Sequence, residues 1–279
     1  MFRYLNILNY KFSVYNMVGN FSFFIFLCFC FTQIKESGTY SIYSVFLPEK
    51  IQRSAIVRFF SSLTVALILS LCAIALPSLA IAYPFSLLFY DFTGQTGAVI
   101  YFGYVLPSFL LFMISAVLLG IKPLKTLDLV VPAYPLTLIF AKLACFCEGC
   151  CNGIQTNYGF YNYFTKVREF PVQLVESAEA LVIFFILLKL RKKAKLGTMF
   201  PLYLIFYSTM RFFSEFLRVE PDIFGPLKCA QIFCVAGIVL GFLGFVLAEK
   251  YAERIDEFFC RTYSKIERKL CEKFSKKSA

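Results

Sequence analysis

The stretch TMFPLYLIFYSTMRFFSEFLR, residues 198–218, is apolar enough to cross a membrane, yet it carries charged side chains. As a helix it would span roughly 30 Å of hydrocarbon. An ionisable group in such a segment costs on the order of 3 kcal/mol on insertion scales, so each one needs an explanation. The stretch therefore predicts a membrane helix with a polar site on it.

Four polar side chains in this stretch have helical spacing. Tyr207, Arg211 and Glu215 recur every fourth residue, and Arg218 follows Glu215 by three, so we expect one shared helical face. A purely structural Arg–Glu pair, with Arg218 reaching the interface, is the simpler alternative. Two arginines beside an acid and a phenol favour an anion site, because a guanidinium binds phosphate or carboxylate with two parallel hydrogen bonds.

The rest of the chain is equally apolar. Its 279 residues are 59% hydrophobic, with a mean hydropathy of +0.71 and 36 Phe, which is too apolar for a soluble core. The predicted fold class is all-α, a polytopic integral membrane helix bundle of about seven transmembrane helices. The predicted spans are 17–34, 55–82, 97–120, 127–147, 171–190, 198–218 and 227–248.

Basic residues predict the orientation of these spans. The net charge of +11 would suggest nucleic acid in a soluble protein, but we expect no such partner for a membrane chain. Most of the 28 Lys and Arg residues lie in alternate connections and in the tail. Basic loops face the cytoplasm, so the N-terminus is expected outside, the C-terminus in the cytoplasm, and 148–170 in an external loop.

The last thirty residues differ in composition from the spans. We divide the chain into a membrane domain, 1–248, and a cytoplasmic basic tail, 249–279. Apolar residues recur at helical spacing among Lys, Arg and Glu in this tail. This pattern predicts an amphipathic helix on the anionic inner leaflet, with a solvated helix as the alternative.

Two more spans carry polar groups near their outer ends. The fifth contains Gln173, Glu176 and Glu179 on one helical face, and Lys142 lies in the fourth, one turn before the loop. Simple bridging between helices is one explanation of such groups. Three helices with polar groups at one depth favour a single positively biased cavity that opens to the outer leaflet.

The following loop, CFCEGCCNG (145–153), is rich in thiols. Cys145, Cys147, Cys150 and Cys151 are crowded and the chain has no histidine, which argues against a zinc site. No thioredoxin-like pattern surrounds the CxxC pair. A structural disulfide and simple packing at a helix end stay open. Gly149 and Gly153 permit a sharp turn and let a lipid headgroup approach backbone amides.

These stretches resemble the prolipoprotein diacylglyceryl transferase family. The chain has Lys142 to Gly153, then FPVQLVE, YSTMRFFSEFLRVEPD and PLKCAQIF, in the order of the family's GRxGNFxxGExxG, HPSQLYE, RFxxEFxRxPD and GQxLS patterns. The resemblance covers roughly 95–248, with a weaker match at Tyr15 in the first span. It implies the same seven-span orientation, in a bacterial plasma (inner) membrane.

The resemblance implies a reaction. Members of the family transfer a diacylglyceryl group from phosphatidylglycerol to the lipobox cysteine of a secreted lipoprotein precursor and release glycerol phosphate, with no metal or cofactor. It implies catalytic roles for Arg211, Glu215 and Lys142. The residues expected to bind phospholipid or substrate are Arg218, Gly149, Gly153, Gln173, Glu176, Tyr15, Tyr207 and Cys145.

The chain also departs from the family pattern. Lys142 replaces an arginine, Cys145 replaces an asparagine, and Phe170 replaces a histidine. Without histidine, Glu215 or Tyr15 would activate the acceptor thiol, or a thiolate would form by itself near positive charge. The competing hypotheses are a transferase with another acceptor, a non-catalytic lipid-binding accessory protein, and a transporter, which the lack of an internal repeat disfavours.

Overall fold

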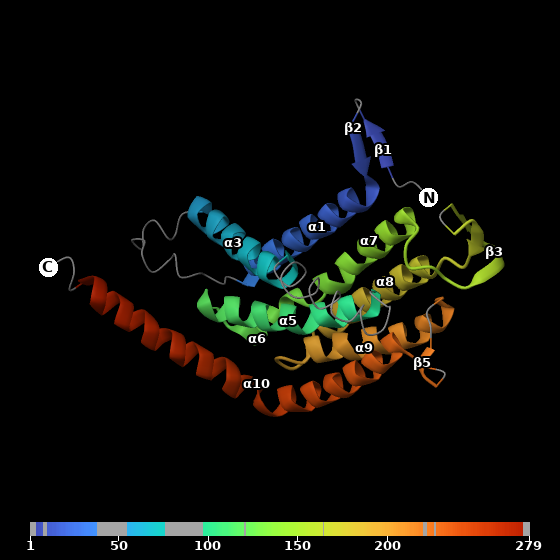
Figure 1. Cartoon of the computed structure of the whole chain (residues 1–279). Coiled ribbons are helices and arrows are strands. Elements are labelled where there is room, and N and C mark those ends of the chain that lie inside the picture. Colours follow the sequence, from blue (N-terminus) through green and yellow to red (C-terminus); the bar gives the residue numbers. More distant parts are fainter. Residues whose placement is uncertain are drawn as a thin grey trace.

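The computed structural model describes residues 4–7, 10–37, 55–75, 97–119, 121–163, 165–219, 222–225 and 227–275. Most of these residues are helical (Figure 1). The helices are α1 (Val14–Ser37), α3 (Ala55–Ser70), a π-helical turn (Leu71–Ala75), α5 (Gly97–Leu118), α6 (Pro123–Val130), α7 (Ala133–Glu148), α8 (Val172–Leu190), α9 (Met199–Ser214) and α10 (Cys229–Ser275). Each predicted span thus contains a helix, although residues 76–82 of the second span lie outside the described residues.

Three of these helices are long and apolar enough to cross a membrane, with windows at Met17–Ile34, Ile56–Ala73 and Cys229–Phe259. The bent pair α6 and α7 could form a fourth span. Helix α8 carries three charged residues and is therefore too polar to count as a candidate span. Helix α9 has only 16 residues and is too short to count as one. The structure is therefore that of a helical membrane protein, and the count of seven spans stays a prediction.

The fourth predicted span is broken by a proline. Pro132 lies between α6 and α7, whose axes differ by 41°. Proline has no amide hydrogen and its ring clashes with the preceding turn, so a helix bends or ends there. The bend separates the short α6 from α7, which carries Lys142 toward the site.

The helices pack around a common apolar core. Helix α9 lies against α8 and α10, and α7 lies against α1 and α8 (Figure 1). Buried hydroxyls connect these helices: Ser22 donates to the Thr137 carbonyl at 2.8 Å and Ser177 to the Ile139 carbonyl at 3.2 Å. Phe26, Leu69, Phe112, Leu127 and Tyr203 are among the largest fully buried side chains.

Helix α10 continues past the predicted domain boundary at residue 248 without a break. Its buried Asp256 accepts hydrogen bonds from the Leu124 amide at 3.0 Å and the Lys125 amide at 3.4 Å, and so satisfies the free amides at the start of α6. The C-terminal part of α10 extends beyond the other helices (Figure 1). The first residues of the predicted tail are therefore attached to the bundle.

The described residues are mostly helical, as predicted, and they also form three small antiparallel hairpins that the all-α prediction does not contain. They lie at the end of the bundle where α7 finishes (Figure 1). Such short strands depend on pairing with a neighbour rather than on a long periodic pattern, so the sequence does not reveal them. The hairpins are β1 (Tyr4–Ile7) with β2 (Tyr10–Ser13), β3 (Gln155–Asn162) with β4 (Val167–Glu169), and β5 (Asp222–Phe224) with β6 (Leu227–Lys228).

The close contact between α9 and α10 generates a test of the fold. A Cβ added at Gly241 would lie 2.6 Å from Cγ1 of Ile205 and 3.1 Å from the Pro201 carbonyl oxygen. We expect Gly241→Ala to lower the melting temperature in detergent, because overpacking costs about 1–3 kcal/mol. The matched control is Gly19→Ala in α1, where an added Cβ meets no atom within 4 Å. A Gly241→Ala protein as stable as the control would contradict this packing.

Candidate functional site

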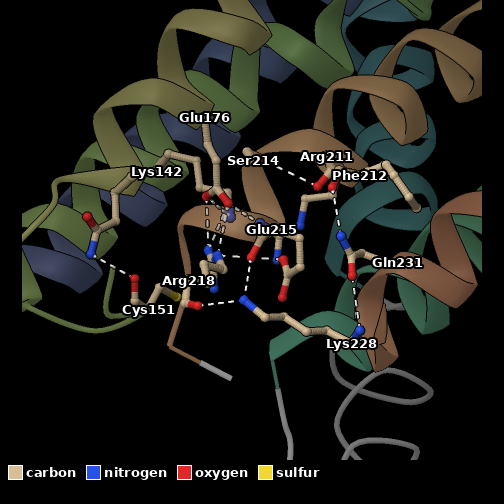
Figure 2. A network of polar contacts seen from close by, with 11 residues as sticks. Lys142, Cys151, Glu176, Arg211, Phe212, Ser214, Glu215, Arg218, Lys228 and Gln231 are labelled. Atoms are coloured by element: carbon tan, nitrogen blue, oxygen red, sulfur yellow. Dashed lines mark hydrogen bonds and ion pairs between the residues drawn. The ribbon is translucent and has the colours of Figure 1, made fainter. Parts of the chain in front are cut away.

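The buried carboxylate of Glu176 on α8 is the centre of a charged network (Figure 2). Glu176 is 3% exposed and contacts three cations. Lys142 Nζ from α7 lies 2.8 Å from Oε2, and Arg211 of α9 contacts Oε1. Arg218 donates from Nε to Oε1 and from Nη2 to Oε2, both at 3.0 Å. One acid thus binds cations from three separate segments, one of them through a two-pronged contact.

A second carboxylate completes the network. Glu215 is fully buried, and its Oε2 lies 2.6 Å from Arg211 Nη2 and 3.9 Å from Arg218 Nε. Arg211 therefore bridges two acids. An isolated buried charge costs several kcal/mol. The charged side chains of the network are therefore stable here only as a set, which consists of Lys142, Glu176, Arg211, Glu215 and Arg218.

Arg218 reaches this network from outside the helix. The prediction of one helical face that continues through Arg218 is wrong, because α9 ends at Ser214 and a short 3₁₀ turn leads to an extended Arg218 (φ −100°, ψ 152°). The flanking backbone pairs with the thiol-rich loop instead: the Ile154 amide donates to the Leu217 carbonyl at 2.9 Å, and the Val219 amide to the Asn152 carbonyl at 3.2 Å. These bonds replace the helical ones.

The two loop glycines have backbone roles. Gly149 ends α7 in the left-handed conformation (φ 79°), and its amide donates to the Cys145 carbonyl at 3.0 Å. A Cβ at Gly153 would lie 2.1 Å from the Phe170 carbonyl oxygen, so only glycine fits between these chains. The predicted sharp turn is present. The predicted contact of these glycines with a lipid headgroup stays a prediction.

Gln173 of α8 holds the thiol-rich loop after α7 in place through hydrogen bonds. Its buried side-chain amide donates to the carbonyls of Cys150, at 2.6 Å, and Cys151, at 3.1 Å. Asn162 of β3 is also buried and donates to the Gly149 carbonyl at 3.2 Å. The loop is therefore held by hydrogen bonds from α8 and from the hairpin.

Two further polar residues of the site are not among the predicted ones. Lys228 Nζ donates to the carbonyls of Glu215 at 2.7 Å and Arg218 at 2.6 Å, where α9 ends (Figure 2). Gln231 accepts from the Lys228 amide at 3.0 Å and donates to the Phe212 carbonyl at 3.2 Å. Cations near a helix C-terminus satisfy its free carbonyls. The feature of the sequence that could have indicated Lys228 is its position directly before an apolar span.

A small cavity of about 10 Å³, with room for roughly one water molecule, lies beside the network between α7, α8 and α9. The polar residues of its wall are Lys142, Glu176, Glu179, Tyr207 and Arg211. Apolar side chains of the same three helices complete the wall. The structure thus brings these five predicted polar residues together at one cavity, whereas Gln173, Glu215 and Arg218 do not line it.

Tyr15 lies at the start of α1, before the apolar window of that helix, and is 44% exposed. Partial burial, together with the nearby thiols of Cys145, Cys150 and Cys151, raises its pKa to about 12. The phenol is therefore protonated at neutral pH. It can donate a hydrogen bond, but it is not a ready base for a thiol.

Three of the four loop cysteines have their sulfurs close together, and the fourth lies apart. The sulfurs of Cys145, Cys150 and Cys151 all lie within 4.8 Å of one another, whereas Cys147 is outside this group. All four are free thiols in the structure. The predicted alternative of a disulfide among them is therefore not formed here.

The structure is thus that of a helical membrane protein with a buried ionic network beside a small cavity. The family model for prolipoprotein diacylglyceryl transferase matches residues 80–247, which is more than half of the chain. The chain therefore belongs to the prolipoprotein diacylglyceryl transferase family.

Several relatives carry the name phosphatidylglycerol–prolipoprotein diacylglyceryl transferase. The protein of Chlorobaculum tepidum is 39% identical over 144 residues, which cover 48% of this chain and 50% of the relative. Those of Clostridium tetani and Clostridioides difficile are 35% identical over 131 residues and 33% identical over 140 residues. These matches cover 44% and 50% of this chain, and 53% and 56% of the relatives. The chain thus spans about half the length of the curated relatives it matches.

The central position of Glu176 generates a prediction. We expect Glu176→Gln to lower the stability of the purified protein by about 3–5 kcal/mol, because three buried cations lose their shared partner. Thermal unfolding in detergent would measure this loss. Glu179→Gln is the matched control, since Glu179 is only partly buried and makes no ion pair among the described residues. Equal melting temperatures for the two variants would show that Glu176 does not hold the network.

Proposed function

We propose that this chain transfers a diacylglyceryl group from phosphatidylglycerol to the cysteine thiol of a secreted lipoprotein precursor. The observation that carries the proposal is the set of cations around Glu176, placed at the wall of a cavity between three helices. Membership of the family supports the same reaction, and the names of the relatives state its donor and acceptor.

The charge balance of the site suits an anionic lipid. Lys142, Arg211, Arg218 and Lys228 stand against the two buried acids Glu176 and Glu215. Positive charge is thus in excess, with Glu179 as a further acid on the cavity wall. A phosphodiester in the cavity would meet Lys142 and Arg211 directly. The cavity holds only about one water molecule in this structure, so α7, α8 and α9 would have to move apart to admit the headgroup, with the acyl chains in the surrounding lipid.

The cations would act mainly on the leaving group. The acceptor thiol releases its proton to water, its thiolate sulfur attacks the glyceryl carbon that bears the phosphate, a carbon–sulfur bond forms, and the carbon–oxygen bond breaks. The electron pair goes to the phosphate oxygen, so glycerol phosphate leaves with more negative charge than the diester had. Fixed cations already in place stabilise this developing charge better than water, which must reorganise.

The membrane setting completes the proposal. Seven spans, an external N-terminus and a bacterial plasma membrane would place the site and the 148–170 loop at the outer face, where secreted precursors emerge. Large aromatic side chains are exposed on and beside β3, including Tyr158 (97%), Phe160 and Tyr163. Exposed aromatic rings of this kind are typical of a membrane–water interface.

The proposed reaction can be tested by comparing the activities of two arginine variants. Arg211→Ala is expected to reduce lipoprotein modification by roughly 10²–10³-fold, the usual cost of losing a donor to developing charge. Arg191→Ala is the matched control: Arg191 bonds to Gln33 at 2.5 Å and to the Leu129 carbonyl at 3.3 Å, in contacts that involve none of the network residues. Each protein is expressed in a bacterium depleted of its own transferase, and the mass of a reporter lipoprotein is measured.

Rescue by the wild-type chain and by Arg191→Ala, but not by Arg211→Ala, would support transfer at this site. Expression and monodispersity in detergent must be equal for the variants. Lack of rescue by the wild-type chain, with normal membrane insertion, would contradict the proposed reaction. Full rescue by Arg211→Ala would instead show that the network is structural.

A further inference from the structure

The start of α10 holds the end of α9 through hydrogen bonds to three backbone carbonyls (Figure 2). Lys228 Nζ donates to the carbonyl of Glu215 at 2.7 Å and to that of Arg218 at 2.6 Å. Gln231, three residues later, donates to the Phe212 carbonyl at 3.2 Å. The bonded carbonyls recur every third residue, so the last turn of α9 and the segment after it are held from one side.

Arg218 depends on such anchors because it lies beyond the end of the helix. Its backbone is extended, with φ −100° and ψ 152°. The Arg218 amide donates to the Glu215 carbonyl at 3.1 Å, and the Val219 amide donates to the Asn152 carbonyl at 3.2 Å. Lys228 therefore holds one side of this segment, and the thiol-rich loop holds the other.

The side chain of Arg218 transmits the position of this backbone to the ionic site. Its guanidinium is 3% exposed and donates to both carboxylate oxygens of Glu176, each time at 3.0 Å. A two-pronged contact requires both groups to keep one mutual orientation, so a small shift of the Arg218 backbone weakens it. A group that fixes the Arg218 carbonyl thus also fixes the cation that contacts Glu176.

Lys228 is itself buried, with 9% of its surface exposed. It is not among the residues that line the cavity between α7, α8 and α9. Burying a cation costs free energy unless the charge is paired or hydrogen-bonded, and the free carbonyls at a helix C-terminus supply such bonds. Capping of α9 is the simpler explanation of Lys228. The bond to Arg218, which lies beyond the helix end, goes further than a cap requires.

We propose that Lys228 is a positioning residue for the transfer reaction, which holds the Arg218 guanidinium on Glu176 by binding the Arg218 carbonyl. The inference rests on the proposed function for the reaction itself. Cations stabilise the charge that develops on a leaving phosphate best when they are already in place, because a group that must first reorganise loses this advantage. Lys228 thus acts on the transition state through Arg218 and does not touch the lipid.

Substitutions of Lys228 separate its hydrogen bonds from the bulk of its side chain. Lys228→Met keeps an unbranched stem but has no donor, so the carbonyls of Glu215 and Arg218 lose a partner. Lys228→Arg keeps the charge and several donors. The matched control is Lys195→Met, because Lys195 pairs with Glu249 at 2.9 Å on the surface, where ion pairs contribute little. Should Lys228→Met fail to fold, Lys228→Gln takes its place under the same criteria.

The first test follows the backbone without any need for activity. Hydrogen–deuterium exchange of the full chain in detergent is measured by mass spectrometry of peptides that contain the Arg218 and Val219 amides. We expect exchange about tenfold faster in Lys228→Met, because a segment opens more easily when a charge-assisted hydrogen bond is lost. Lys228→Arg and Lys195→Met should exchange at the wild-type rate. Unchanged exchange in Lys228→Met would overturn the proposal.

The second test asks whether the effect on catalysis passes through Arg218. Transfer from phosphatidylglycerol vesicles to a lipobox peptide is measured for Lys228→Met alone and in an Arg218→Gln background. Alone, we expect kcat to fall roughly 10–100-fold with little change in KM, because the lost interaction belongs to the transition state. In the Arg218→Gln background, kcat should change by less than about twofold. A general loss of folded protein would lower kcat equally in both backgrounds, so additive losses would contradict the proposal.

The two tests distinguish this inference from the proposed function. If the wild-type chain transfers lipid and Lys228→Met has the same kcat, Lys228 is not a positioning residue and the transferase stands. If the wild-type chain transfers nothing, but exchange at Arg218 rises in Lys228→Met and not in Lys195→Met, the anchoring of Arg218 stands and the transferase is wrong. Restoration of both slow exchange and kcat by Lys228→Arg would support both.

Discussion

The sharing of one carboxylate by three cations is the interaction on which the site depends. Glu176 draws Lys142, Arg211 and Arg218 to a single point, and these come from α7, α9 and the segment after α9. In an apolar bundle none of these charges is stable alone, so the network also fixes how the three segments meet. The effects of substitutions within it should be strongly non-additive, since each residue sets the surroundings of the others.

The sequence predicts the structure best where long apolar runs coincide with charged residues that are unusual in such runs. Apolar runs located the helices, and the cost of burying charge identified Lys142, Glu176 and Arg211, which do meet at one cavity. The sequence does not predict helix ends that are set by hydrogen bonds to a distant segment. The end of α9 is set by hydrogen bonds to the loop at Asn152–Ile154, which no helical pattern contains. Lys228 was overlooked because a lysine before an apolar span ordinarily indicates only an interface.

The thiol-rich loop shows that spacing in the sequence does not reveal how thiols are arranged in space. Crowding of four cysteines argued against a metal, because ligands of one ion are usually drawn from separated pairs. A left-handed turn at Gly149 and another at Cys151 fold the loop so tightly that three sulfurs converge and Cys147 stays apart. Such backbone angles become visible only in three dimensions.

Helix α10 has a mechanical consequence. Its 47 residues rise about 1.5 Å each, so the helix follows a path of about 70 Å, and it bends part-way so that its C-terminal part runs in another direction (Figure 1). Gln231, near one end, donates to the Phe212 carbonyl in the last turn of α9, while Asp256 contacts α6 far along the same helix. Because the helix is held at Gln231 and again at Asp256, a displacement of its free C-terminal part would reach α6 before it reached the end of α9.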